Sequence, residues 1–331
     1  MFKIAIDVGP LSTGDAIRGI GVYTRELLSA LELLQKEKKD EFEVYPVDYF
    51  NAQGSTRYNV VHFTRFNPFR ISVPFEKPAG TKFVLTIYDL IPLIYPKHYP
   101  PGIKGWVRWQ INKYLIRKKI DKIITISETS KKDICRFIGV DPNKVVVTYL
   151  APRSIFKKVQ NAKIENLPKH FALYVGDINY NKNIPNLVKA CKLAGVKLVI
   201  AGKQAAGLDK VDLEHPENRH LKNTRWDEVV RLGFVADEDL VNIYNLADVY
   251  IQPSYYEGFG LPLLETEACG TPIVASKNQC HVEILGSSFD YVDPKDPNSI
   301  AKGILNPNIN KKLPRDYSWA KTAKETLEVY K

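Results

Sequence analysis

The fold is decided by the stretch Val249-Tyr250-Ile251-Gln252-Pro253-Ser254-Tyr255-Tyr256-Glu257-Gly258-Phe259-Gly260-Leu261-Pro262-Leu263-Leu264-Glu265. Its apolar start, residues 249–252, predicts a buried strand. Pro262 suits the first turn of a helix, where its missing N–H removes no helical hydrogen bond, and Gly270 is a typical residue just after a helix end. A strand, a glycine-containing loop and a helix in succession are typical of the ligand-binding corner of a parallel α/β sheet.

The same alternation of short apolar runs and helical stretches extends along the rest of the chain. Runs rich in Val and Ile predict strands at 3–7, 60–63, 83–88, 122–126, 144–149, 171–175, 197–201, 230–233, 249–252 and 272–275. A stretch with two prolines and little periodicity, Ala151–His170, predicts the connection between two domains. The sequence therefore predicts an α/β protein with two Rossmann-like, doubly wound domains, residues 1–152 and 153–315, facing each other across a cleft.

Composition and charge narrow the classes of function. The 331 residues are 44% hydrophobic and 25% charged, which is ordinary for a globular protein and excludes disorder, collagen and coiled coil. The net charge is +10, and residues 1–155 carry +9 of it, with 24 basic and 15 acidic side chains. We therefore expect an anionic partner to meet the N-terminal half. The four cysteines are widely spaced, without a C-x-x-C pair, and are expected to be reduced thiols.

Two features bear on membranes and polyanions. Asp7 cuts the N-terminal apolar stretch too short for a signal peptide, and no apolar run could span a bilayer, so we expect a cytoplasmic protein. The segment Lys104–Lys122 carries seven basic side chains against one acid, with Trp106, Trp109 and Tyr114 between them. It could lie on anionic lipid at the inner face of the plasma membrane or form a partly buried helix with solvated lysines. No nucleic-acid partner is expected, because no recognition motif is present.

The loop of the opening stretch has the chemistry of a diphosphate site. Gly258 and Gly260 form a tight loop before a helix N-terminus, whose N–H groups and dipole favour an anion. Glu257 in the loop and Glu265 in the first turn of the helix flank this position. A helical spacing would separate them by about 12 Å, beyond the roughly 5–9.5 Å of a hydrolytic pair, so hydroxyl binding is the better use of each. A solvated Glu257 and a Glu265 that complements the helix dipole remain the alternative.

Taken with the elements on either side, Ala247-Asp248 and Gly270-Thr271-Pro272-Ile273-Val274, this stretch resembles the C-terminal domain of family 4 retaining glycosyltransferases of the GT-B fold, in their mannosyltransferase-like group. The E-x7-E signature of that family corresponds to Glu257 and Glu265. The resemblance implies that Glu257 contacts donor-sugar hydroxyls near the reacting carbon, and that Glu265 holds the nucleotide ribose. It also implies that the donor meets the loop residues Gly258, Phe259, Gly260 and Leu261.

The resemblance extends to a lysine in the second domain and then departs from the family. Lys182 resembles the lysine that binds the donor diphosphate, where a cation neutralises charge on the leaving group. Many members carry an arginine just before it, where this chain has Asn181. Asn181 can still donate hydrogen bonds to the donor but brings no charge.

In the N-terminal half the similarity is looser. Gly19 and Gly21 resemble the family's glycine loop and would approach the donor phosphates or the acceptor. Tyr88 stands where the family commonly has a histidine that helps to hold the donor sugar, and a tyrosine offers no cation at neutral pH. His62 resembles a recurrent family histidine, although a packed strand histidine is at least as good an interpretation.

Two further acidic features have simple structural interpretations. The triplet Asp237-Glu238-Asp239 has the form of a metal-binding D-x-D but is better explained as an acidic helix N-cap. Glu283 stands where the family often has a glutamate and is expected to make a structural contact. No metal site is therefore predicted.

The predicted function is transfer of a hexosyl group, with retention, from a nucleotide diphosphate sugar to a hydroxyl of a glycan or lipid-linked glycan in cell-surface glycan assembly. No metal or other cofactor is expected, since a lysine and helix-end amides can stabilise the leaving diphosphate. The final segment, Asp316–Lys331, would fold as a helix that returns to the N-terminal domain, as in related enzymes. A nucleotide-sugar epimerase, a phosphorylase and a non-catalytic nucleotide-sugar binder are the alternatives.

Overall fold

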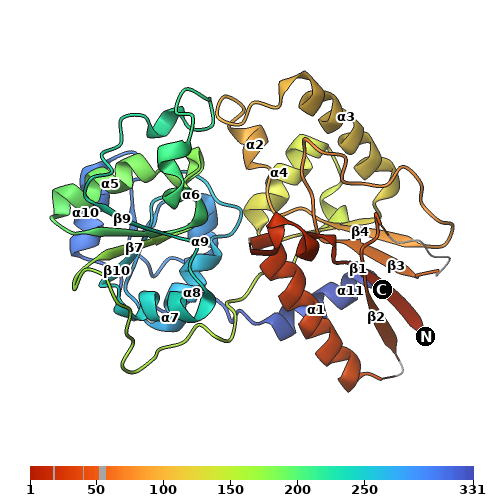
Figure 1. Ribbon diagram of the computed structural model, residues 1–331. Helices are drawn as coiled ribbons and strands as arrows, with labels where there is room; N and C mark the ends of the chain where they lie inside the picture. Colours follow the sequence, from red (N-terminus) through yellow and green to blue (C-terminus); the bar gives the residue numbers. More distant parts are fainter. Residues whose placement is uncertain (18, 40, 52–56) are drawn as a thin grey trace. The chain divides into compact units, whose positions relative to one another are not determined.

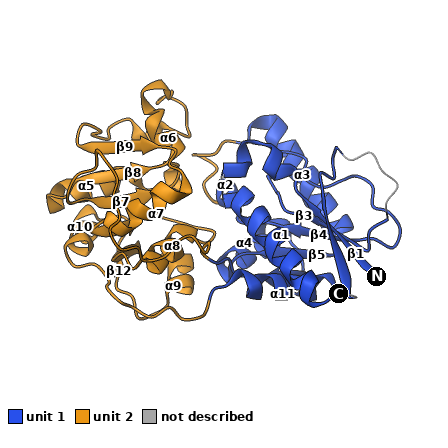
Figure 2. Cartoon of the chain, turned by 60° about the horizontal axis from the view of Figure 1, so that its bottom comes forward, with its two compact units in different colours: residues 1–93, 101–151, 317–331 blue, residues 94–100, 152–316 orange. Residues whose placement is uncertain are grey.

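The computed structural model describes residues 1–17, 19–39, 41–51 and 57–331. The described chain forms two compact units, each built on a parallel sheet (Figure 2). Unit 1 comprises residues 1–93, 101–151 and 317–331, and unit 2 comprises residues 94–100 and 152–316. Each unit therefore contains a segment that is separated from the rest of it in the sequence.

The sheet of unit 1 has the strand order β2-β1-β3-β4-β5-β6, and its neighbouring strands are parallel (Figure 1). The chain runs from β1 outward to β2 and returns to β3 on the other side of β1. The topological switch point, where α/β sheets bind ligands, thus lies between β1 and β3. The strands are β1 (Phe2–Asp7), β2 (Phe42–Val47), β3 (Val60–Phe63), β4 (Lys82–Thr86), β5 (Lys122–Thr125) and β6 (Val145–Val147).

The helices of unit 1 follow its strands in α/β fashion. α1 buries residues at helical spacing, Tyr23, Leu27, Leu31 and Leu34, as expected for one face of a helix that covers a sheet. α4 begins with a side-chain cap, because the Ser127 hydroxyl accepts from the N–H of Ser130. The α-helices are α1 (Gly19–Glu37), α2 (Ile91–Ile94), α3 (Gly102–Lys119), α4 (Glu128–Ile138) and α11 (Trp319–Tyr330), and the 3-10 turns are η1 (Gly9–Ser12), η2 (Gly14–Ile17) and η3 (Pro142–Lys144).

The sheet of unit 2 has the order β12-β11-β10-β7-β8-β9, again parallel. This is the order of a dinucleotide-binding sheet, with its switch point between β7 and β10. The strands are β7 (Ala172–Val175), β8 (Leu198–Ala201), β9 (Val229–Gly233), β10 (Val249–Gln252), β11 (Ile273–Ser276) and β12 (Tyr291–Val292). The helices are α5 (Ile184–Ala194), α6 (Lys203–Ala206), α7 (Asp237–Leu246), α8 (Leu261–Cys269), α9 (Gln279–Leu285) and α10 (Pro297–Leu305), with 3-10 turns η4 (Tyr180–Lys182), η5 (Leu208–Lys210) and η6 (Arg219–Leu221).

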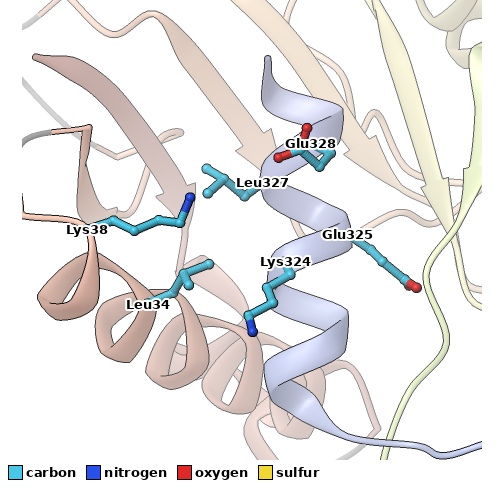
Figure 3. Close-up of a pocket in the computed structure, with 6 residues that line it drawn as sticks. All are labelled: Leu34, Lys38, Lys324, Glu325, Leu327 and Glu328. Atoms are coloured by element: carbon cyan, nitrogen blue, oxygen red, sulfur yellow. The ribbon is translucent and has the colours of Figure 1, made fainter.

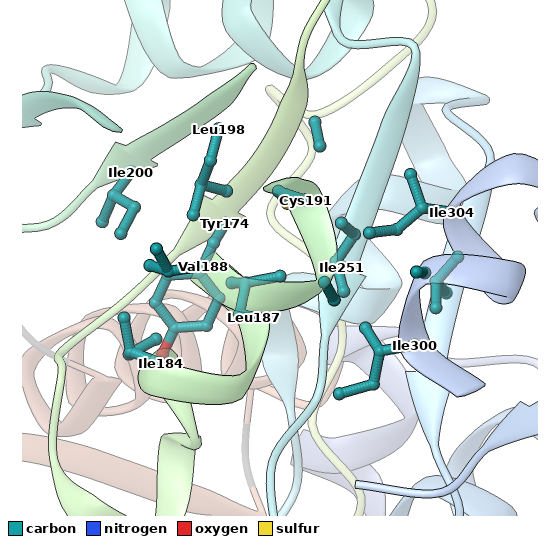
Figure 4. Packing of buried hydrophobic residues seen from close by; sticks show 14 of the residues in the cluster. Tyr174, Ile184, Leu187, Val188, Cys191, Leu198, Ile200, Ile251, Ile300 and Ile304 are labelled. Carbon is teal, nitrogen blue, oxygen red and sulfur yellow. The ribbon is translucent and has the colours of Figure 1, made fainter. Parts of the chain in front are cut away.

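The core of unit 2 lies on both faces of its sheet. Along β7, Ala172 and Tyr174 belong to a cluster that includes α5 and α10, whereas Phe171 and Leu173 belong to a second cluster with α7 and α8. This alternation is the period of two expected for a strand covered on both faces. Figure 4 shows the first cluster, in which the side chains of α5 and α10 pack against β7, β8 and β10.

The last helix, α11, completes unit 1 rather than unit 2. It lies beside α1 (Figures 1 and 2), and its Tyr330 hydroxyl lies 2.6 Å from Nδ1 of His62 on β3. The second ring nitrogen of His62 lies 2.7 Å from the hydroxyl of Thr86. Burial lowers the pKa of His62 to about 3, so this histidine is neutral and packed inside the sheet.

Each predicted strand is present, with ends displaced by at most a few residues. Two further strands were not predicted, and one segment was assigned to the other domain. β2 carries the charged Glu43 and Pro46, and the proline is tolerated because β2 lies at the sheet edge. β12 has only two residues, too few for a periodic signal. Residues 94–100, assigned from the sequence to the N-terminal domain, belong to unit 2 through ring and hydrogen-bond contacts made far along the chain.

Within the described residues, no helix is both long and apolar enough to cross a membrane.

Candidate functional site

The candidate site lies at the switch point of unit 2. β7 and β10 are neighbours, with Val249 opposite Ala172 and Tyr250 opposite Leu173. Two loops leave the carboxyl ends of these strands, residues 176–183 after β7 and residues 253–260 after β10. Ligands of open α/β sheets bind at this position, so the side chains of these two loops are the first to consider.

Lys182 and Glu257 meet across these two loops. Nζ of Lys182 lies 2.9 Å from Oε1 and 2.8 Å from Oε2 of Glu257. The Glu257 side chain is 5% exposed and that of Lys182 is 24% exposed, so the carboxylate is buried while the ammonium retains some contact with solvent. The sequence named both residues, and the structure brings them together as an ion pair.

Further donors surround the Glu257 carboxylate. Its Oε1 accepts a hydrogen bond from the Ser254 hydroxyl at 2.6 Å and another from Nε2 of Gln252 at 3.0 Å. Burial raises the pKa of Glu257, but the charge of Lys182 and these hydrogen bonds outweigh burial and hold it below the usual value. Glu257 is therefore an ionised carboxylate fixed in one orientation, not the solvated loop residue of the alternative interpretation.

The glycine loop leads directly into α8. Gly260 has the left-handed φ of 92° and immediately precedes Leu261, the first residue of the helix. A Cβ at Gly260 would lie 3.1 Å from Nε2 of Gln252, so glycine also leaves room for the side chain that binds Glu257. The amides of residues 258–261 and the positive end of the α8 dipole follow Glu257 directly in the sequence, an arrangement that favours an anion.

Glu265 lies one residue deeper in α8 than the sequence suggested. The helix begins at Leu261, so Glu265 is its fifth residue and belongs to the second turn, where it does not complement the helix dipole directly. Its Oε2 accepts from the Tyr244 hydroxyl at 3.1 Å, and its Oε1 lies 3.9 Å from a guanidinium nitrogen of Arg153. Burial raises the pKa of Glu265 to about 7, and Arg153 and Tyr244 offset only part of this effect.

Arg153 connects Glu265 to the acidic start of α7. Both of its terminal nitrogens bind the carboxylate of Asp237, one of them at 2.9 Å to Oδ1. The prediction of an acidic N-cap is wrong, because the N-cap of α7 is Ala236 and Asp237 is the first helical residue. The Asp237 carboxylate binds the Arg153 guanidinium instead. Among the described residues, no group of His, Cys, Asp or Glu side chains is arranged to hold a metal ion.

Asn181 is buried and bonded at both ends of its side-chain amide. Its Oδ1 accepts from the Tyr99 hydroxyl at 2.7 Å, and its Nδ2 donates to the carbonyl of Tyr256 at 3.0 Å. Its backbone carbonyl accepts from the N–H of Tyr255 at 2.8 Å. Asn181 therefore contacts the loop that carries Glu257, a role the sequence did not suggest.

His281, at the start of α9, was not predicted from the sequence. Its Nδ1 lies 3.0 Å from the carbonyl of Ser276 and 3.0 Å from Nδ2 of Asn278. Burial lowers its pKa to about 4 even though the Glu257 charge opposes this, so His281 is neutral at physiological pH. Its Nε2 is buried and has no hydrogen-bond partner within the described part of the chain. The residue lies on the element where the sequence pointed to Glu283, which is half-buried.

The predicted residues of the N-terminal half lie in unit 1. The Tyr88 hydroxyl donates to the carbonyl of Thr64 at 2.6 Å, and burial raises the pKa of Tyr88 well above its usual value. Gly19 is the first residue of α1, and a Cβ there would meet no heavy atom within 4 Å. A Cβ at Gly21 would lie 2.4 Å from the carbonyl oxygen of Ala16. Gly21 is thus required by chain packing, whereas Gly19 faces open space.

The basic segment forms α3 and the start of β5, because the helix ends at Lys119 and Lys122 begins the strand. Trp109, Leu115 and Ile116 are buried against the sheet. On the other side Ile103 is 85% exposed, Trp106 57% and Tyr114 61%. Lysines and arginines flank this exposed stripe: Lys104, Arg108, Lys113 and Lys118.

A pocket of about 300 Å³ lies elsewhere, between α1 and α11 of unit 1 (Figure 3). Side chains of both charges line it, together with two leucines: Leu34, Lys38, Lys324, Glu325, Leu327 and Glu328. It contains none of the predicted site residues, and its mixed charge does not favour a diphosphate.

Known proteins share this fold and this sequence pattern. Residues 156–325 match the family of glycosyl transferases group 1, and residues 47–151 match glycosyltransferase family 4. The first match covers more than half of the chain and includes Lys182, Glu257 and Glu265. The chain therefore belongs to the group 1 glycosyl transferases, and its two parallel-sheet α/β units are those of the GT-B fold.

Individual relatives agree with this assignment. The chain is 28% identical over 274 residues to the O-antigen chain mannosyltransferase B of Escherichia coli, an alignment that covers 75% of this chain and 70% of that protein. It is 26% identical to the serotype-specific mannosyltransferase WbdA of Escherichia coli over 86% of this chain, but spans only 36% of that longer protein. Sucrose-phosphate synthase from Thermosynechococcus elongatus shares the fold, with a TM-score of 0.63 at 18% identity over 100% of this chain and 94% of that one.

Proposed function

We propose that this glycosyltransferase moves a sugar from a nucleotide diphosphate sugar to a hydroxyl of a cell-surface glycan or lipid-linked glycan, with retention of configuration and without a metal ion. The observation that carries the proposal is the Lys182–Glu257 pair beside the glycine loop at the switch point of unit 2. Such a pair offers a cation for the diphosphate and a fixed carboxylate for sugar hydroxyls. The family assignment supplies the reaction class.

Different site residues would bind different parts of the donor. Lys182 and the amides of Phe259, Gly260 and Leu261 would bind the diphosphate and stabilise its charge as the glycosidic bond breaks. Glu257 would accept hydrogen bonds from sugar hydroxyls. When the donor binds, the ammonium of Lys182 has to be shared between the diphosphate and Glu257, and Gln252 and Ser254 keep the carboxylate oriented meanwhile.

Glu265 would hold the ribose of the nucleotide. Vicinal ribose hydroxyls donate well to a carboxylate, and the Tyr244 hydroxyl and Arg153 keep this carboxyl group in place. Because the pKa of Glu265 is about 7, its ionised form and therefore ribose binding are expected to gain from a pH above neutral.

The donor sugar is proposed to be mannose. Two relatives that align with most of this chain are mannosyltransferases, one named for the O-antigen chain and the other as serotype-specific. The near-neutral C-terminal half suits a donor bound by few charges, while the +9 carried by residues 1–155 suits an anionic acceptor.

The acceptor side is proposed to lie against an anionic membrane through α3. The exposed apolar and aromatic side chains of this helix are Ile103, Trp106, Val107 and Tyr114, and basic residues flank them. This is the composition of an interfacial helix, in which apolar side chains enter the headgroup region and lysines meet the lipid phosphates. Binding to vesicles of anionic phospholipid at low salt, absent for vesicles of zwitterionic lipid, is the expected result.

Co-sedimentation tests the membrane contact with a matched pair of variants. Trp106→Ser should weaken sedimentation with anionic vesicles several-fold. Leu33→Ser removes a similarly exposed apolar side chain from α1 and should leave sedimentation unchanged. Equal sedimentation of the Trp106→Ser protein and the parent protein would show that α3 does not form the membrane contact.

The transfer reaction is tested with the purified protein, GDP-, UDP- and ADP-sugars and a lipid-linked glycan acceptor. We expect a thermal shift with one nucleoside diphosphate, because a ligand of the native state stabilises it, followed by transfer from the matching sugar. NMR of the product anomeric proton would show retention, and EDTA should not slow the reaction. Inversion, or loss of activity in EDTA that a divalent cation restores, would contradict the respective part of the proposal.

Two variants separate catalysis from folding. Glu257→Ala and Glu257→Gln should both abolish transfer while the protein remains folded and still binds the nucleoside diphosphate. Near-normal turnover of either variant would overturn the role of Glu257.

The alternative functions would give different results with the parent protein. Conversion of the nucleotide sugar without acceptor would indicate an epimerase, and phosphate-dependent release of a sugar phosphate would indicate a phosphorylase. Binding without turnover would indicate a non-catalytic protein.

A further inference from the structure

A segment from within the N-terminal half of the chain packs onto the donor-site loops. Residues 94–100 belong to unit 2, whereas the residues before and after them, up to 93 and from 101, belong to unit 1. The ring of His98 stacks on Tyr180 with centroids 3.4 Å apart and planes within 7° of parallel. Tyr95 contacts Tyr180 edge-on at 5.4 Å. These ring contacts hold the segment against η4, the turn that ends at Lys182.

A hydrogen-bond relay continues from this segment into both site loops. The Tyr99 hydroxyl donates to Oδ1 of Asn181, and Nδ2 of Asn181 donates in turn to the carbonyl of Tyr256. Because Asn181 is 2% exposed, water cannot replace either bond at low cost. The Asn181 amide thus joins three segments that lie far apart in the sequence.

The relay acts on the residues next to the ion pair. Asn181 immediately precedes Lys182, and Tyr256 immediately precedes Glu257. On the other side of Lys182, Asn183 donates to the carbonyl of Pro253 at 2.9 Å. Lys182 is therefore flanked by two asparagines that both bind the loop carrying Glu257. Small movements of one loop against the other would change the distance between Nζ and the carboxylate.

We propose that Tyr99 and Asn181 are positioning residues, which hold the loops of Lys182 and Glu257 at the separation that catalysis requires. The inference rests on the function proposed above. It assigns to residues 94–100 a role in positioning the loops of the donor site. Neither residue touches the donor. Tyr99 fixes the side-chain orientation of Asn181, and Asn181 fixes the spacing of the two loops, so that donor binding finds Lys182 and Glu257 already in place.

The structure offers a narrow test of this role. Tyr99→Phe removes one hydroxyl, while the stacking of His98 and the contact of Tyr95 keep the segment docked. Tyr95→Phe removes a hydroxyl from the same segment and retains its ring contacts, which makes it the matched control. Asn181→Ser removes the whole bridge.

Steady-state kinetics and nucleotide binding are measured on the full-length protein. We expect Tyr99→Phe to lower kcat at least fivefold and to change the Kd of the nucleoside diphosphate less than twofold, with Tyr95→Phe unchanged in both. Asn181→Ser should lower kcat further. The double variant should be no slower than Asn181→Ser alone, because both changes break one relay.

The pH profile distinguishes positioning from a general loss of stability. If the loops separate, Lys182 stabilises the Glu257 carboxylate less, so the acidic limb of the kcat profile should move to higher pH in Tyr99→Phe. A merely structural role would lower the melting temperature without moving this limb.

The outcomes separate this inference from the proposed function. If the parent protein transfers sugar, and Tyr99→Phe has a normal kcat and an unmoved acidic limb, the positioning role is overturned and the proposed function stays intact. Additive effects in the double variant would also overturn the relay. A parent protein that binds the nucleotide sugar but transfers nothing would overturn the proposed function, and the inference would fall with it.

Discussion

Lys182 donates to both carboxylate oxygens of Glu257, at 2.8 and 2.9 Å, across two loops that are 75 residues apart in the sequence. The sequence assigned the two residues to different parts of the donor, one to the diphosphate and the other to the sugar. Their direct contact means that a compensated charge pair lies at the place that we propose for the donor. Replacing Lys182 alone leaves the buried carboxylate without its cation and therefore affects stability as well as catalysis.

The first prediction separates these two effects. Lys182→Met should lower the free energy of unfolding by about 3 kcal/mol, because it leaves a buried carboxylate without its cation. Lys182→Met combined with Glu257→Gln should recover most of this loss, since neither charge is then buried, but it should not recover transfer. Urea unfolding of the three proteins measures this. A double variant as unstable as the single one would show that the pair contributes little to folding.

The second prediction concerns Glu265, whose pKa is raised to about 7 by burial. The unfolded chain loses this proton near pH 4.5 and the folded protein near pH 7, so the folded state loses stability as the pH rises between these values. The cost above pH 7 is at most about 3 kcal/mol. Glu265→Gln should therefore melt at a higher temperature than the parent protein at pH 8, with a difference that disappears toward pH 4.5.

Nucleotide binding provides the control for that prediction. Glu265→Gln should bind the nucleoside diphosphate more weakly at pH 8, because an amide accepts ribose hydrogen bonds less well than a carboxylate. If stability at pH 8 is unchanged or falls, then Arg153 and Tyr244 compensate the buried charge more fully than we infer.

The third prediction compares two glycines of unit 1. Gly21→Ala should destabilise the protein by about 1–3 kcal/mol, because the new methyl group would overlap the Ala16 carbonyl. Gly19→Ala meets no neighbour and should leave the melting temperature unchanged within about 1 °C. If the donor phosphates or the acceptor approach Gly19, the same variant should raise a KM several-fold. Unchanged kinetics in Gly19→Ala would show that neither the donor phosphates nor the acceptor approach Gly19.

The fourth prediction concerns Tyr88. Its hydroxyl donates to the Thr64 carbonyl, and its ring packs edge-on against Tyr23 at 5.3 Å. Tyr88→Phe should cost about 1 kcal/mol of stability through the lost hydrogen bond and should keep turnover within about tenfold of the parent protein. A loss of turnover of a hundredfold or more with unchanged stability would instead favour a direct contact with the donor sugar.

The sequence predicted those features that have a local pattern. Strands buried on both faces form short Val- and Ile-rich runs, and the Glu257–Glu265 stretch combines a strand, two glycines and a proline at fixed offsets. Such patterns are visible because backbone conformation restricts nearby residues. Glu265 was placed one helical position too early because Pro262, rather than Leu261, was taken as the first helical residue.

The features that the sequence missed depend on contacts between distant segments. The bond between Arg153 and Asp237 and the relay from Tyr99 to Asn181 have no local signature, because each partner alone has an ordinary composition around it. The same holds for Nε2 of His281, which has no hydrogen-bond partner among the residues that the structure describes. Asn181 shows the difficulty well. From the sequence it is a residue that lacks a charge, whereas in the structure it is a buried amide with a partner at each end.

The place of α11 in the chain has a consequence for how the protein is made. Unit 1 owes part of its core to Leu327 and Tyr330, both buried, and the ribosome synthesises them after all of unit 2. The β-strands of unit 1 emerge first, and the residues that α11 covers stay uncovered until residues 319–330 have been synthesised. Unit 2, whose strands and helices lie almost wholly within residues 152–316, can fold in the meantime, so it is able to complete its fold before unit 1 although most of it is translated later.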